Sequence, residues 1–364
     1  MAGPVLAHVA GNWAWLAMLG LCALAYLFGA VMRFNISHIE PLIASGAPPA
    51  SITWLERISS FALAFAYFIS VAYYLNLLAA FALKAAGIIN PELVSWISSF
   101  VIIALGAIGS LKGLHALENV EMPAVSLKLA LITGLLAGLA LTAILEMIEG
   151  GVMLSEHNHA TGKEEISILL GLVILVQGFE TSRYLGDSYP EKTRIQTMRY
   201  AQLIATVIYM AFIILITPYF KSDLPVNGGE TQVIDMLAPL GSFFAPLIIL
   251  TALASQLSAA VADMNGAGGL LEDASNHKIS VRVGYFSTAL IALIITWSAN
   301  IFDIITFASK AFVLYYGLQS LTAMVALMKV KEDHSCLRFS AKMALFSLAT
   351  LLAIIVLIFG KPVG

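Results

Sequence analysis

The sequence predicts an all-α, polytopic membrane protein with about ten transmembrane helices, and two observations support this fold class. Of the 364 residues, 60% are hydrophobic and only 11% are charged, whereas a soluble domain carries about 25% charged residues. The apolar residues also fall into ten stretches of about 20 residues, the length that a helix needs to cross a bilayer. This pattern excludes a soluble globular domain, and no segment is basic enough to indicate nucleic-acid binding.

Short polar segments separate the apolar stretches, with Pro, Gly, Asn and charged residues at the boundaries. None of these segments is long enough to be an interdomain linker, so we treat residues 1–364 as a single transmembrane domain. The expected spans are 12–32, 59–83, 91–111, 124–146, 166–185, 199–218, 237–262, 283–300, 303–328 and 341–360.

The sequence predicts neither a metal site nor an enzyme. Cys22 and Cys336 indicate no disulfide framework. Glu156, His157 and His159 lie close together in the loop after the fourth span, but a solvated acidic loop explains them better than a metal site. No catalytic triad, phosphate-binding Gly loop or HExxH pattern occurs, so we expect no cofactor apart from a coupling proton or sodium ion.

The fifth expected span, 166–185, is interrupted in its middle. Its apolar run is followed, still at membrane depth, by Gln177, Gly178 and Glu180. A carboxylate inside a span costs about 2.5–3.5 kcal/mol, so it normally faces a protein cavity, and glycine lets the backbone unwind. Hydrocarbon cannot satisfy the freed backbone groups, so a break near 177–181 predicts a ligand site of the kind found in discontinuous transporter helices. The alternative is a glycine packing contact followed by a glutamate that has already reached the headgroups.

The distribution of positive charge predicts the orientation. With ten alternating spans, 14 of the 19 Lys and Arg residues fall on one side, four fall on the other, and Lys310 lies inside a span. The positive-inside rule makes the more basic side cytoplasmic. We therefore expect a multi-pass protein of the cell membrane, with both chain ends outside and the span 166–185 running inward. The loops that contain Arg194 and Lys331 are expected in the cytoplasm.

Four segments resemble the amino acid–polyamine–organocation (APC) superfamily. The stretch GFETSRYLGDSYPEKTRIQTMRYA resembles that superfamily's passage from an unwound Gly-Phe-Glu-type segment of the sixth helix into the seventh. Three other stretches are similar to its third helix, to its passage from the fourth helix into the fifth, and to its eighth helix with the following loop. In this order, the segments lie at 178–201, 57–81, 109–132 and 252–275. The resemblance covers most of the chain, and the order and spacing of the segments carry more weight than any single one.

The resemblance implies a LeuT-like fold, in which two inverted repeats of five helices each begin with a broken helix. Only four spans precede the break here, so 12–146 is expected to be an incomplete first repeat, 166–328 a second repeat and 341–360 an additional helix. Residues 1–12, MAGPVLAHVAGN, contain nothing that we recognise as a broken first helix. We expect that the family's first helix is absent, either through a late start of the reading frame or through a deletion. A groove should then lie beside Gly178–Thr181.

Glu180 is the leading candidate for a coupling proton site, because a carboxylate in a cavity of low dielectric constant can load and release a proton. The backbone at Gly178, Phe179 and Thr181 is expected to bind a polar group of the substrate, with the Phe179 ring as a gate or wall. The alternative for Phe179 is a ring that faces lipid or the core. In the second span, Tyr73 is expected to border the site.

Lys128 in the fourth span has two interpretations. It is either a snorkelling lysine at the interface or, by resemblance to proton-coupled members of the family, an ammonium that stands where sodium binds in relatives. Its partners would be Ser255 and Ser258, which are three residues apart and share a helix face. The alternative for the two serines is packing of small residues between helices. Asn76 in the second span should also have an interhelical partner.

Lys310 lies about seven residues into the ninth span, where an ammonium facing lipid is costly. We expect it to face the interior of the bundle, as a substrate-binding or gating residue, or else to form a structural ion pair or to snorkel. Tyr315 and Tyr316 lie one to two turns further in, and either could form a hydrogen bond inside the bundle.

The sequence therefore predicts a secondary active transporter that moves a small organic solute, most simply an amino acid or an amine, by alternating access with proton or sodium coupling. The alternatives are a membrane scaffold or partner subunit, an ion pathway, or an inactive truncated carrier. The expected partners are the solute and the lipid bilayer, and the oligomeric state stays open.

Overall fold

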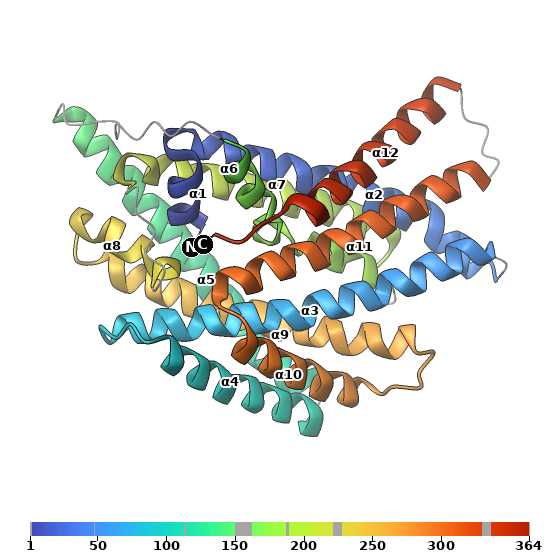
Figure 1. Cartoon of the computed structure of the whole chain (residues 1–364), viewed down its shortest axis with the longest axis horizontal. Coiled ribbons are helices and arrows are strands. Elements are labelled where there is room, and N and C mark those ends of the chain that lie inside the picture. Colours follow the sequence, from blue (N-terminus) through green and yellow to red (C-terminus); the bar gives the residue numbers. More distant parts are fainter. Residues whose placement is uncertain are drawn as a thin grey trace.

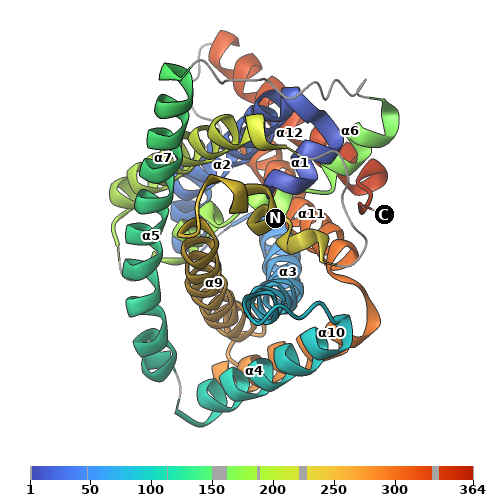
Figure 2. The same cartoon turned by 90° about the vertical axis from the view of Figure 1, so that its left-hand side faces the viewer.

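A computed structural model describes residues 2–46, 48–112, 114–149, 162–186, 189–220, 228–329 and 336–363. These residues form helices and connecting segments, and no strand occurs among them. Nine helical segments in the described ranges are long and apolar enough to cross a membrane. Figures 1 and 2 show the long helices gathered into one bundle. The all-α, polytopic fold class is therefore confirmed, whereas Glu156, His157, His159 and Lys331 lie outside the described residues.

The long helices follow the nine uninterrupted spans of the prediction in order. They are α2 (Ala14–Ala44), α3 (Ala50–Ala85), α4 (Pro91–Lys112), α5 (Leu114–Ile148), α7 (Glu191–Ile216), α9 (Phe244–Ala274), α10 (Val281–Ser298), α11 (Ile301–Lys329) and α12 (Cys336–Phe359). The short elements are α1 (Ala2–Ala10), η1 (Gly11–Trp13), α6 (Lys163–Leu170), η2 (Val173–Val176), η3 (Phe179–Tyr184), η4 (Thr217–Tyr219), η5 (Gly229–Thr231), α8 (Val233–Leu237) and η6 (Ala238–Leu240).

The first ten residues differ from the prediction, because they include a buried helix. Val5, Leu6 and Val9 of α1 are fully buried, and the helix packs against α2 and α6. The chain then turns through Gly11, whose φ of +48° favours glycine, and enters α2. Hydropathy over 20 residues misses such an element, because a nine-residue helix is too short to be a span. These residues therefore contribute a short helix that packs against α6, and the absence of the family's first helix stays a prediction.

The span predicted at 237–262 is also displaced. Helix α9 begins at Phe244 and continues to Ala274, so residues expected in a loop are helical. The extended part of α9 packs closely on α10, because a Cβ on Gly284 of α10 would lie 2.7 Å from the Cα of Gly268 of α9. Gly268 and Gly284 therefore form a point of close helix contact, as is common between membrane helices.

Helices α3 and α11 form the centre of the bundle, and both are buried over most of their apolar length. Helix α3 packs along α9 and α11, and Figure 2 shows α3 and α9 next to each other with α4 and α5 further out. By contrast, α5 and α12 expose most of their apolar residues, as expected for helices that face lipid. Side chains on α3 and α11 therefore meet the broken span inside the protein.

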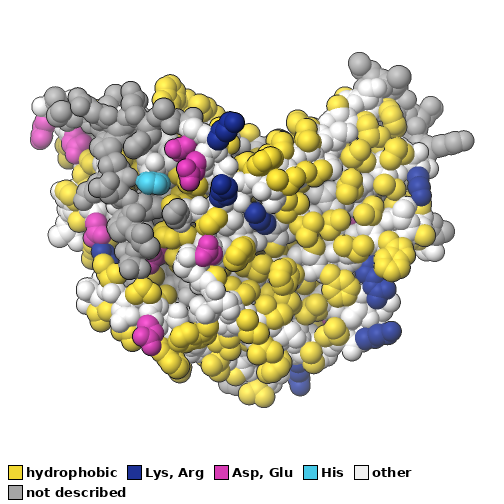
Figure 3. Space-filling model, in the orientation of Figure 1, with side chains coloured by type: hydrophobic (Ala, Val, Ile, Leu, Met, Phe, Trp, Pro, Cys, Tyr) yellow, Lys and Arg dark blue, Asp and Glu magenta, His cyan; other side chains and the backbone are white. Residues whose placement is uncertain are grey.

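The surface in Figure 3 is largely apolar, and its charges are unevenly distributed. The visible acidic side chains gather toward the left end, and the right end carries Lys and Arg. In the same orientation, α3 begins and α9 and α11 end at the right (Figure 1). This arrangement agrees with the orientation derived from charge, which stays a prediction.

Candidate functional site

The break in the span 166–185 is present and is longer than predicted. Helix α6 ends at Leu170, and two separate 3-10 segments, η2 and η3, replace the rest of the helix. Between them, Gln177 is extended and Gly178 has a φ of +109°, a conformation that L side chains rarely adopt. A continuous helix ending in a glutamate at the headgroups is therefore excluded.

The backbone groups freed by the break bind to neighbouring elements. The N–H of Ile174 donates to the Ser309 hydroxyl of α11 at 3.0 Å. The carbonyl of Leu175 accepts a hydrogen bond from the Tyr209 hydroxyl of α7 at 2.9 Å. These partners replace the missing helical hydrogen bonds, which an apolar environment would leave unsatisfied.

Glu180 is completely buried beside the break. Its Oε2 accepts hydrogen bonds from the Tyr316 hydroxyl and from the N–H of Gly178, both at 2.9 Å, and Tyr67 approaches the same carboxylate. The ring of Phe179 stacks on Tyr316 at 5.2 Å and helps to cover the site. The second carboxylate oxygen, Oε1, is buried without a hydrogen-bond partner, so this atom keeps an unused acceptor position.

The side chains of two predicted binding residues, Thr181 and Lys310, form no hydrogen bond with Glu180 in the described part of the chain. Thr181 is exposed, and its hydroxyl donates to the Gly178 carbonyl at 2.9 Å. Lys310 is half-buried on α11, on the same helix face as Gly317 seven residues later. A Cβ on Gly317 would meet Ala353 of α12 at 3.1 Å. This spacing puts Lys310 on the α12 side of its helix, and its role in binding stays a prediction.

A cavity of about 610 Å³ lies at the C-terminal ends of α3 and α10 and the N-terminal ends of α4 and α11, and a second cavity of about 360 Å³ lies at the break itself. The predicted residues Tyr73 and Ser255 line the second cavity together with Gln177. Residues Gly178–Thr181 are not part of its lining. The lining also includes Ala2, Met18, Tyr74, Leu77, Phe81, Ile132, Leu135, Leu136, Ile174, Leu175, Ile208, Tyr209, Phe212, Val233, Ile248, Thr251, Ala252 and Gln256.

The lining of the 360 Å³ cavity is uncharged over the described residues, with aromatic rings, aliphatic side chains and two amides. The Nε2 of Gln177 donates to the Tyr74 hydroxyl, while the Oε1 atoms of Gln177 and Gln256 are buried without partners. Amide groups of this kind can orient a polar group of a solute whose body packs against the aromatic rings.

Lys128 contacts the helix that the sequence indicated. Its ammonium donates to the Ser258 hydroxyl of α9 at 3.2 Å, and Ser255, one turn earlier, lines the cavity. The predicted contact is confirmed, and the role of Lys128 in coupling stays a prediction. Asn76 also has the interhelical partner that we expected, because its Nδ2 donates to the Thr296 hydroxyl of α10 at 2.9 Å.

Sequence reasoning missed a second buried carboxylate. Asp263 of α9 is 6% exposed and accepts a hydrogen bond from the Ser70 hydroxyl of α3. An Asp within the apolar stretch LSAAVADMNG is a signal that could have revealed it. We overlooked the signal because we placed the end of the span at residue 262.

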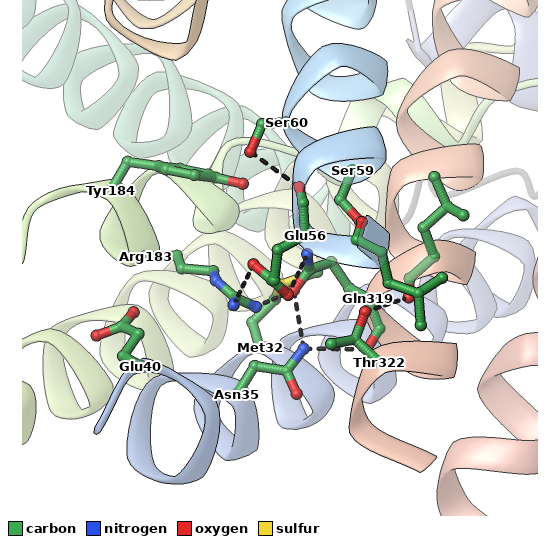
Figure 4. Close-up of polar contacts among 12 residues, drawn as sticks. Met32, Asn35, Glu40, Glu56, Ser59, Ser60, Arg183, Tyr184, Gln319 and Thr322 are labelled. Carbon is green, nitrogen blue, oxygen red and sulfur yellow. Dashed lines mark hydrogen bonds and ion pairs between the residues drawn. The ribbon is translucent and has the colours of Figure 1, made fainter. Parts of the chain in front are cut away.

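On the other side of Glu180, a polar cluster joins four elements (Figure 4). Arg183 of η3 forms an ion pair with Glu56 of α3 at 2.8 Å, and it also donates to Gln319 of α11. The Nε2 of Gln319 donates to Glu56 at 3.2 Å, and Asn35 of α2 donates to the Oε1 of Gln319 at 2.8 Å. Because Arg183, Asn35 and Gln319 are buried, the cluster closes the bundle between Glu180 and the more basic end.

A second arginine holds the segment that follows η3. Arg194 at the start of α7 donates from two nitrogens to the Glu40 carboxylate of α2, at 2.5 and 3.0 Å. The same guanidinium donates to the carbonyls of Arg183 at 2.9 Å and Tyr189 at 3.1 Å. A bidentate arginine of this kind fixes orientation as well as distance.

Comparisons with known proteins agree with this geometry. A family model described as APC superfamily transporter matches residues 1–360. An uncharacterized protein of Aquifex aeolicus (strain VF5) is 36% identical over 366 residues, which cover 100% of this chain and 87% of that protein.

Two solved structures have the same LeuT-like fold. The crystal structure of MhsT in complex with L-phenylalanine is similar with a TM-score of 0.64 and 16% identity, over 99% of this chain and 94% of that chain. A substrate-bound, outward-open Na+-coupled sialic acid symporter gives a TM-score of 0.51 and 13% identity, over 100% of this chain and 90% of that one. The chain belongs to the APC superfamily of transporters.

Proposed function

We propose that this transporter moves an amino acid or a similar small amine through the 360 Å³ cavity at the break, driven by a proton gradient. The observation that carries the proposal is the position of this cavity, which lies against the broken span and is bordered by Gln177, Tyr73 and Ser255. Its volume falls within the range of small-molecule sites, and its aromatic rings and amide groups suit a small organic solute that carries a polar group. The relatives bound to L-phenylalanine and transporting sialic acid show that this fold accommodates small organic solutes.

Two side chains support a proton in preference to sodium. The ammonium of Lys128 lies against Ser258, at the position where the family resemblance puts sodium in relatives, and a fixed positive charge there opposes sodium binding. Glu180 supplies a buried carboxylate with one unpartnered oxygen. A buried negative charge is costly at membrane depth, and a proton on this carboxylate would cancel that charge.

The test is uptake by the full chain, purified and reconstituted in liposomes. Radiolabelled amino acids and amines are offered under an inward proton gradient, an inward sodium gradient, or no gradient. We expect accumulation with the proton gradient only. The variants Gln177→Leu and Ser255→Ala should reduce uptake at least tenfold, while Thr133→Val, on the exposed face of α5, should leave it unchanged.

Four outcomes would overturn the proposal. Accumulation with sodium alone would contradict proton coupling. Ion current without solute uptake would favour an ion pathway, and equal uptake by the cavity variants and the control would place the solute elsewhere. A protein that takes up none of the amino acids or amines offered, although it stays folded, would favour the scaffold alternative.

A further inference from the structure

Two glutamine side chains, Gln177 and Gln256, line the 360 Å³ cavity. Gln177 lies in the extended link between η2 and η3, and Gln256 lies on α9 directly after Ser255. The Oε1 atom of each glutamine is buried without a hydrogen-bond partner among the described residues. Two elements that are far apart in the sequence therefore each contribute a side chain with an unused acceptor to the same cavity.

Several hydrogen-bond donors of this cavity are already used inside the protein. The Thr251 hydroxyl donates to the Leu247 carbonyl at 2.6 Å, and the Tyr209 hydroxyl donates to the Leu175 carbonyl at 2.9 Å. One N–H of Gln177 is used in the same way, because it donates to a tyrosine hydroxyl of α3. These donors are occupied, whereas the two amide oxygens still have an acceptor position to offer.

The charge of the lining favours the same kind of ligand. No Lys, Arg or His occurs among the lining residues that the structure describes, so a carboxylate in the cavity would have no cationic partner in this lining. A buried carboxylate without such a partner is costly. The rings of Tyr73 and Tyr74, whose centroids lie 5.0 Å apart, can instead attract an ammonium group through their faces.

We propose that Gln177 and Gln256 determine the specificity of this cavity, because their amide oxygens bind the N–H groups of a small amine with an apolar body. A solute that fills the cavity displaces water from both oxygens and has to supply donors in its place. An amine supplies N–H donors in its charged and its neutral form, whereas a carboxylate only accepts. The Ser255 hydroxyl can donate or accept, so it does not distinguish the two classes of solute. The inference rests on the proposed function, since it names the solute class of the same cavity.

Isothermal titration calorimetry on the purified full chain tests this specificity without a gradient. Four ligands share a phenyl group on a two-carbon chain and differ in their polar group: 2-phenylethylamine, its N,N,N-trimethyl derivative, L-phenylalanine and 3-phenylpropionate. We expect 2-phenylethylamine to bind most tightly, and the trimethyl derivative, which keeps the charge but has no N–H, to bind about tenfold more weakly. L-Phenylalanine should also bind about tenfold more weakly, because its carboxylate is buried without a cation. No binding of 3-phenylpropionate should be measurable.

Two variants separate recognition of the amine from a structural role. Gln256→Met keeps the length of the side chain but removes its acceptor. It should weaken the binding of 2-phenylethylamine about tenfold and leave that of the trimethyl derivative unchanged, a difference that a merely structural role would not produce. Gln196→Met, at an exposed position of α7, is the matched control and should bind all four ligands as wild type does.

Equal weakening of both amines in Gln256→Met would show a structural role and overturn the inference. Tighter binding of L-phenylalanine than of 2-phenylethylamine to wild type would overturn it too, as would a folded protein that binds none of the four ligands. If this binding pattern is found but the reconstituted protein takes up no solute, the proposed function fails and the specificity of the cavity stands. If amino acids accumulate and Gln256→Met binds both amines as wild type does, the proposed function stands and the inference fails.

Discussion

Arg183 of the broken span and Glu56 of α3 form an ion pair of 2.8 Å, with side chains only 3% and 17% exposed. The pair lies between Glu180 and the basic end of the bundle, and Gln319 contacts both of its members. If the protein transports by alternating access, as the sequence predicts, this end of the bundle has to open and the ion pair has to separate or move. Its energy then contributes to the preference for the closed state.

Removing both members of this pair should cost less than the sum of the two single removals. Arg183→Gln leaves Glu56 without its cation, and Glu56→Gln leaves a buried guanidinium without its anion, so each should lower the free energy of unfolding by about 3 kcal/mol. The double variant should lose clearly less than the sum. Thermal denaturation of the purified protein measures all three, and strictly additive losses would show that the two side chains do not depend on each other.

Gly178 should resist substitution because of its backbone and not because of crowding. Its φ is +109°, and a Cβ there would meet no atom within 4 Å. We expect Gly178→Ala to lower stability by about 1–2 kcal/mol through backbone strain. The matched control is Gly134→Ala in α5, which is also free of contacts within 4 Å but is helical with ordinary φ. The control should be neutral or slightly stabilising, and equal effects in the two variants would contradict the strain at Gly178.

Crowding should dominate at Gly266, where a methyl group would press on the Tyr67 ring. We expect Gly266→Ala to cost about 1–3 kcal/mol and to reduce proton-driven uptake more than tenfold, because the methyl group displaces the Tyr67 ring, which approaches Glu180. Gly269→Ala, one turn further along α9, has no atom within 4 Å of its Cβ and should retain both stability and uptake. If Gly266→Ala transports normally, the position of Tyr67 is unimportant.

Glu230 in η5 gives a pH-dependent prediction outside the spans. Burial raises the pKa of this carboxyl group in the folded protein, so the folded state favours the neutral form. Ionisation therefore lowers stability as the pH rises from the unfolded pKa through the folded one, and the loss is absent below both values. Glu230→Gln should raise the melting temperature at pH 8 and leave it unchanged near pH 4. Glu164→Gln, at an exposed position of α6, should match wild type at both values, and an effect of Glu230→Gln that does not depend on pH would contradict the assignment.

The features predicted correctly from the sequence depend on polarity and spacing along one chain. Gln177, Gly178 and Glu180 within an apolar run require a break wherever the neighbouring helices lie. Asn76 requires a partner at membrane depth, and the spacing of Ser255 and Ser258 puts both on one helix face. Such features follow from the cost of burying unpaired polar groups.

The features that were missed depend on which helices are neighbours. Ser309 and Tyr316 share one face of α11, and Lys310 lies on a different face of the same helix. The position of α12 decides what that face contacts, and the sequence of α11 alone does not reveal it. The helix of residues 2–10 is stable because α2 and α6 cover it, which its own length does not reveal. Asp263 was missed because the predicted span ends at residue 262, whereas α9 continues to Ala274.

The hydrogen bonds of Arg194 have a mechanical consequence. This one guanidinium is attached to the Glu40 side chain near the end of α2, to the backbone of Arg183 in η3 and to its own helix α7. The Arg194 side chain therefore links α2, η3 and α7 at one point. A displacement of the unwound segment η3 then moves α2 and α7 as well. Gly178 has a left-handed φ and no atom within 4 Å of a Cβ position. A change of the backbone dihedral angles at this residue can then move two full membrane helices.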